Sequence, residues 1–158
     1  MNLDECRALC GYINKIRPSQ EMDDDTPKAW VHVLAGVTIA DARVVVIGLA
    51  RDKAWIDPHE IVAASRRLRR ARLAEAGFEE LTPNVDPDDT TGWVAERRAL
   101  RDAIASGAMS VADVRAYERA EVPPLTGAAP WIEAGQQLTS KPLARVLAAA
   151  AKRRAVPS

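Results

Sequence analysis

Aromatic residues make up only 4% of the 158-residue sequence, and much of its 47% hydrophobic content is alanine. Alanine favours helix but buries little apolar surface, so the sequence predicts a thin core built between helices. No apolar run is long enough to cross a membrane, and Asp4 and Glu5 stand near the start, where a signal peptide would carry basic and then apolar residues. We therefore expect a cytoplasmic protein.

Motifs for catalysis are also missing. The sequence has no glycine-rich phosphate loop, no dinucleotide-binding fingerprint and no nucleophile elbow. Its two histidines, His32 and His59, would have to supply any serine triad or histidine-based acid–base pair, and neither lies in a pattern that supports one. These absences predict a non-catalytic protein without a cofactor, which works by binding other macromolecules.

Metal-binding patterns are absent as well. Cys6 and Cys10 are four residues apart in a helical pattern and share a face with Leu9 and Ile13. A disulfide within one helical turn would be strained, so we expect both thiols to be reduced and buried. Their spacing does not match a zinc finger, knuckle or ribbon, and the acidic run at 23–25 lacks the ligand spacing of a calcium loop. We predict no metal site.

Apolar residues at helical spacing predict an all-α fold. The first helix is expected at 3–16, with Asn2 as its N-cap and Pro18 just beyond its end. The second begins at Thr26, with Pro27 at its first helical position. The apolar face of this second helix is formed by Trp30, Val33, Leu34 and Val37.

The third and fourth helices carry clear starting signals. Thr38 followed by Asp41 resembles a capping box, and this signal favours a helix over the strand that the β-branched run at 44–47 could form. Asp57 and Pro58 then begin a fourth helix that runs to about residue 76, with Gly77 as its natural C-cap. Two aromatic residues are expected in the core between these helices, Trp30 and Trp55.

The sequence divides into three parts. Residues 1–77 predict a compact bundle of about four helices with short loops. Residues 78–92 contain two prolines and several acidic residues, which predicts an acidic linker. Residues 93–158 predict a helical, partly flexible C-terminal region. We expect helices at 89–106, 110–120 and 141–154, the first of which begins just before this region.

The most distinctive charge cluster is a group of arginines on the expected fourth helix. Residues 61–76 carry five arginines and one glutamate, whereas residues 77–92 carry five acids and no base. The cluster predicts a docking surface for phosphates or for an acidic protein surface, and a solvated helix face is the simpler alternative. Its members are Arg66, Arg67, Arg69, Arg70 and Arg72.

The C-terminal region offers two further candidates for partner binding. Trp131 follows a proline in a loop-like stretch, where it could anchor a partner or pack the tail onto the body. Basic residues at the end of the last expected helix could contact nucleic acid or a partner, and they also suit the negative end of a helix dipole. These residues are Lys152, Arg153 and Arg154.

The order of features in the first half of the sequence resembles that of phage replicative-helicase loader and inhibitor proteins. An amphipathic helix closed by Pro18 precedes a polar stretch and a helix that contains Trp30 and Leu34. A short turn then leads into a helix with Asp41-Ala42. An aromatic-apolar-x-Pro-x-x-Ile element follows at 55–61, and a basic helix comes after it.

This resemblance implies a small helical domain joined to a flexible C-terminal region, with no ATPase site of its own. Proteins of this family bring the hexameric replicative helicase to an initiator complex and restrain the helicase until it is delivered. The resemblance therefore implies the helicase as a partner, contacted through the C-terminal region, and a replication initiator as a second partner.

Two other functions fit the same sequence. The third and fourth helices could form a helix-turn-helix-like pair with arginines on the DNA backbone, although their connection is longer than the usual tight turn. An adaptor that binds and regulates a host protein is also compatible with the composition. Partner identity, stoichiometry, oligomeric state and the choice between loader and inhibitor stay open at this point.

Overall fold

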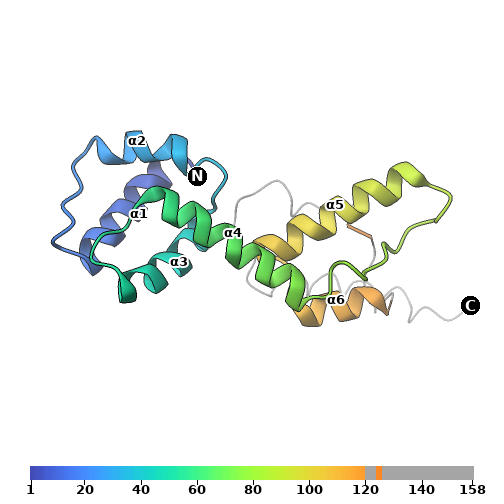
Figure 1. The fold of residues 1–158 in the computed structure, drawn as a ribbon. Coiled ribbons are helices and arrows are strands. Elements are labelled where there is room, and N and C mark those ends of the chain that lie inside the picture. Colours follow the sequence, from blue (N-terminus) through green and yellow to red (C-terminus); the bar gives the residue numbers. More distant parts are fainter. Residues whose placement is uncertain (120–123, 126–158) are drawn as a thin grey trace, which may run out of the picture. The chain divides into compact units, whose positions relative to one another are not determined.

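A computed structural model of the protein describes residues 1–119, 124 and 125. Within these residues it contains six helices and no strand, which confirms the predicted all-α fold (Figure 1). The helix expected at 141–154 lies outside the described residues. The six helices are α1 (Leu3–Ile16), α2 (Thr26–Val33), α3 (Ile39–Asp52), α4 (Pro58–Glu75), α5 (Thr90–Ser106) and α6 (Val111–Glu118).

The helices belong to two compact units, each with a hydrophobic core of its own. Unit 1 comprises residues 1–70 and contains α1, α2, α3 and most of α4, whereas unit 2 begins at Ala71. The division lies inside α4 and not after Gly77, where the sequence places the end of the bundle. The reason is that Leu73 and Ala76 pack against the second core.

Helix α1 forms where the capping signals place it. The side chain of Asn2 accepts from the N–H of Glu5, and the carboxylate of Glu5 accepts from the N–H of Asn2, which completes a capping box. The helix contacts both α2 and α3. Its buried face consists of Cys6, Leu9, Cys10 and Ile13, and both thiols are free, as expected.

The buried cysteines give a direct test of how well this face is closed. Burial raises the pKa of Cys10 to about 11 and also raises the pKa of Cys6. Because the thiolate is the reactive form, we expect a thiol reagent at about pH 8 to modify the native protein about 100-fold more slowly than the urea-unfolded protein. Equal rates in the two states would contradict the closed core.

Helix α2 is shorter than its apolar pattern suggests. It begins at Thr26, so Pro27 is its second residue, and it ends at Val33. Leu34 and Val37 lie beyond its end, yet both are buried in the core of unit 1. The apolar spacing therefore identified core residues correctly but overestimated the length of the helix.

The connection between α3 and α4 is fixed by a side chain from a distant loop. The buried amide of Gln20 donates to the carbonyl of Ile56 at 2.7 Å and accepts from the N–H of Ile56 at 2.9 Å. Ile56 is thereby held in the core. Trp55 was expected there, but its side chain is 60% exposed, so the prediction for this residue is wrong. Trp30 packs partly buried against the core.

Unit 2 is built around α5 and α6. Phe78 and Leu81, which the sequence assigns to a linker, are nearly inaccessible parts of its core. The guanidinium of Arg97 lies 4.9 Å from the ring centre of Phe78 and donates to the carbonyl of Leu81 at 2.9 Å. The first residues after α4 are therefore structural, whereas the acidic residues at 86, 88 and 89 are exposed.

A buried polar cluster joins four segments of unit 2. The hydroxyl of Tyr117 donates to Oε1 of Glu96 at 3.0 Å, and the N–H of Leu125 donates to the same oxygen at 2.6 Å. The N–H of Asn84 donates to the hydroxyl of Tyr117 at 2.6 Å. Burial raises the pKa of Tyr117, because the phenolate would be poorly solvated there. The cluster ties α5 and α6 to the segments around 84 and 125.

Candidate docking surface on helix α4

The sequence gives α4 a well-defined start and a strongly basic second half. The side chain of Asp57 accepts from the N–H of His59 at 2.7 Å, which caps the first turn. Ile61 and Ser65 face the core of unit 1. The arginines that follow occupy different environments, and only some of them are available to a partner.

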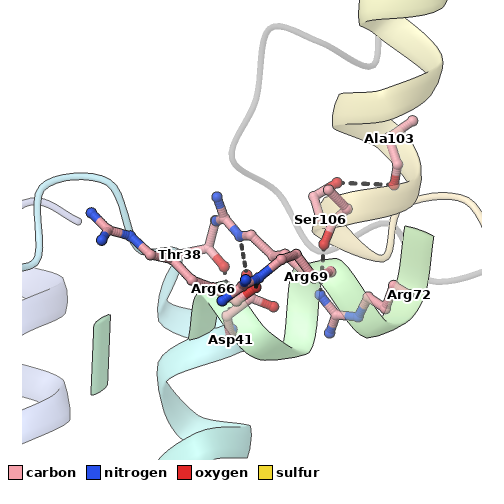
Figure 2. A network of polar contacts seen from close by, with 9 residues as sticks. Thr38, Asp41, Arg66, Arg69, Arg72, Ala103 and Ser106 are labelled. Carbon is pink, nitrogen blue, oxygen red and sulfur yellow. Dashed lines mark hydrogen bonds and ion pairs between the residues drawn. The ribbon is translucent and has the colours of Figure 1, made fainter. Parts of the chain in front are cut away.

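Arg69 is part of the internal structure of unit 1. Its Nε donates to the carboxylate of Asp41 at 2.8 Å, and the Asp41 side chain is fully buried (Figure 2). The hydroxyl of Thr38 accepts from the N–H of Asp41, so the predicted capping contact is present at the start of α3. Asp41 therefore links the start of α3 to α4.

Arg72 has a structural role in unit 2. Its guanidinium donates to the carbonyl of Ala105 at 2.9 Å. It also lies beside Gly107, where an added Cβ would come within 3.1 Å of the guanidinium carbon. Gly107 has a φ of 79° and closes α5, so a glycine is favoured there on both counts. Arg72 thus helps to hold the end of α5.

The remaining three arginines form an exposed group on α4. Arg66, Arg67 and Arg70 are all exposed, and Nε of Arg70 reaches the carbonyl of Arg66 at 3.4 Å. They lie within about one and a half turns of the helix, so their charges add at close range. We call these three residues the basic face. They are the members of the predicted cluster that are best placed to meet phosphates or acidic side chains.

A hollow in unit 1 adjoins the basic face through Arg66. It has a volume of about 430 Å³ and lies open to solvent between α2 and α4. Its lining contains one arginine, Arg66, and no acidic residue, so it favours an anionic group. The lining residues are His32, Val33, His59, Val62, Ala63 and Arg66.

Sequence reasoning did not bring the two histidines together. His32 lies in the last turn of α2 and His59 lies in the first turn of α4, and only the packing of these helices places both at one hollow. Among the described residues no group of three or more histidine, cysteine, aspartate or glutamate side chains could hold a metal ion. The hollow is therefore best viewed as an extension of the basic face.

Other predicted site residues lie outside the described part of the chain. These are Trp131, Lys152, Arg153 and Arg154. Within the described part, no helix is both long and apolar enough to cross a membrane. Comparisons of the chain with protein-family models, curated proteins and solved structures found no match in any of the three.

Proposed function

We propose that the protein is a non-catalytic adaptor of phage-type DNA replication, which binds the hexameric replicative helicase in the cytoplasm and helps to load or restrain it. The observation that supports the proposal is that several apolar residues of the segments that resemble the loader and inhibitor family are buried in unit 1, although Trp55 of the same segments is exposed. Leu34, Ala42, Ile56 and Ile61 are fully buried in one core. The resemblance thus includes part of the core of unit 1.

The basic face gives this adaptor a surface on which to meet a partner. Arg66, Arg67 and Arg70 are exposed on a helix that is itself fixed by its buried residues and by Arg69. A charged surface on a rigid helix accelerates encounter with an acidic partner and selects its orientation. This arrangement suits an adaptor that must bring two proteins together and then release them.

The experiment that tests the proposal is a titration of the purified replicative helicase of the same replication system. The DNA-stimulated ATPase rate of the helicase is measured as the full chain is added, and a saturable change in rate is expected. A parallel titration without DNA separates a direct effect on the helicase from competition for DNA. An unchanged rate up to tens of micromolar protein would contradict the proposal.

DNA binding is the second candidate function, and the exposed basic face favours it. Helix α3 and the part of α4 up to Arg70 are consecutive and belong to the same unit, as in a helix-turn-helix arrangement. The three exposed arginines and the hollow could contact successive backbone phosphates.

The DNA-binding alternative makes its own prediction. It requires duplex DNA to bind at about 50 mM salt, and the triple variant R66A/R67A/R70A should lose about 10-fold or more in affinity with a shallower salt dependence. The control is R98A/R101A, which removes two exposed arginines of α5. Fluorescence anisotropy measures both. Under the adaptor function we expect weak DNA binding that the triple variant barely changes.

A further inference from the structure

The hollow between α2 and α4 brings together both histidines of the chain and an arginine. His32 comes from α2, whereas His59 and Arg66 come from α4. The hydrogen bond that His59 donates to Asp57 and the one that Arg66 accepts from Arg70 involve backbone atoms of His59 and Arg66. Within the described part of the chain, none of the three side chains has a hydrogen-bond or ion-pair partner. Their polar atoms are therefore available to a ligand.

These three side chains favour an oxyanion over a metal ion. Arginine offers N–H donors and no acceptor, and an imidazole offers at least one N–H donor whether it is neutral or protonated. Arg66 would repel a metal ion, and the lining contains no cysteine, aspartate or glutamate to complete a coordination sphere with the two histidines. A phosphate monoester presents three strong acceptor oxygens, which match the three donor side chains in number.

The charges near the hollow in the sequence also favour an anion. No acidic residue occurs at 26–40 or at 61–74, the stretches that contain every lining residue except His59. The acids that precede these stretches are engaged by other groups. Asp25 pairs with Lys28 at 2.6 Å, Glu60 pairs with Lys53, and Asp57 accepts from the N–H of His59. The exposed arginines of the basic face therefore dominate the charge beside the hollow.

The rest of the lining is apolar and consists of Val33, Val62 and Ala63. The volume of about 430 Å³ lies within the range of about 300–1,000 Å³ that is usual for small-molecule sites. A bare phosphate would leave the apolar part of the wall uncovered. An organic group attached to the phosphate would cover it and add apolar burial to the polar contacts.

We propose that this hollow binds a small organic phosphate monoester. The phosphate contacts His32, His59 and Arg66, and the organic group packs against the apolar part of the wall. The inference goes beyond the adaptor function and does not depend on it. It also gives the hollow a ligand of its own, because Arg67 and Arg70 do not line it.

Arg66 and Arg67 provide a matched pair of variants, since both are exposed on α4 but only Arg66 lines the hollow. The full chain is titrated with phenyl phosphate, and its backbone amide signals are followed by NMR. R66Q is expected to weaken binding by about 10-fold or more, because a charged hydrogen bond is lost. R67Q should weaken it by less than about 2-fold, since solvent and salt screen a charge outside the site. The double variant H32A/H59A should also lose about 10-fold.

Inorganic phosphate and phenol separate the two parts of the ligand. Both should bind more weakly than phenyl phosphate, because each fills only one part of the hollow. The altered residues are exposed, so the melting temperatures of the variants should stay close to that of the wild type.

The inference is supported if phenyl phosphate shifts the amide signals of the lining residues saturably and only the variants of lining residues weaken its binding. It is overturned if R66Q and R67Q weaken binding equally, because the charge of the basic face alone would then explain it. Phenol or inorganic phosphate binding as tightly as phenyl phosphate would also overturn it. So would the absence of saturation up to about 10 mM phenyl phosphate. The helicase titration decides the proposed function separately.

Discussion

Replacing Arg69 by methionine is expected to lower the free energy of unfolding of unit 1 by about 3 kcal/mol. Asp41 is fully buried, and its carboxylate accepts from Nε of Arg69 at 2.8 Å. Methionine keeps much of the aliphatic packing but removes the charge that faces this carboxylate. The cost arises mainly because the buried carboxylate of Asp41 loses a charged partner in the folded state. Arg69 is only partly exposed there, so the loss of its own contact with solvent contributes little.

The control for this variant is Arg67→Met, which makes the same change in charge on the same helix at an exposed position. It should alter the free energy of unfolding by no more than about 0.5 kcal/mol. Urea denaturation followed by circular dichroism and tryptophan fluorescence measures both variants. Similar stabilities for the two would mean that the ion pair between α3 and α4 contributes little to unit 1.

Replacing Glu96 by alanine is expected to lower the free energy of unfolding of unit 2 by about 3 kcal/mol. The side chain of Glu96 is fully buried, and one of its oxygens accepts from the hydroxyl of Tyr117 and from the N–H of Leu125. Alanine removes this acceptor and leaves a small cavity beside the core. Two buried donors then lose the partner that they have in the native protein.

Glu96→Gln separates hydrogen bonding from the other effects, because its amide oxygen can still accept from both donors. We expect this variant to be clearly more stable than Glu96→Ala. The exposed Glu118 on α6 provides a control, and Glu118→Ala should cost about 0.5 kcal/mol or less. Equal losses for the glutamine and alanine variants at position 96 would contradict a role for the accepted hydrogen bonds.

The helices could be predicted from the sequence because their signals are local. Asn2, Thr38 and Asp57 each accept a hydrogen bond from an N–H two or three residues later, and their identities alone indicate a helix start. Gly107 similarly marks the end of α5. Such interactions depend on a few neighbouring residues, so they can be read without knowing how the helices pack.

The packing between distant segments could not be predicted in the same way. Trp55 was expected in the core because it is large and aromatic, yet Ile56 takes that place through the amide of Gln20, which is thirty-six residues away. Phe78 and Leu81 belong to a segment whose prolines and acids suggested a linker. In both cases, residue type alone did not show which side chains are buried, because that depends on contacts with residues distant in the sequence.

The candidate site shows the same division between local and non-local information. The sequence located the arginine cluster on α4, but it could not separate Arg69 and Arg72 from the exposed basic face. Their partners, Asp41 and the carbonyl of Ala105, lie far away in the chain. The predicted docking role of Arg66, Arg67 and Arg70 remains a proposal, to be tested with a purified partner.

The most direct test of the adaptor function is size-exclusion chromatography with light scattering. The full chain is mixed with the hexameric replicative helicase of its own replication system at micromolar concentrations. We predict a single complex whose mass equals that of the hexamer plus a fixed number of chains. Separate elution of the helicase and the protein, each at its own mass, would contradict the proposed function and leave DNA binding or a host-protein partner as the alternative.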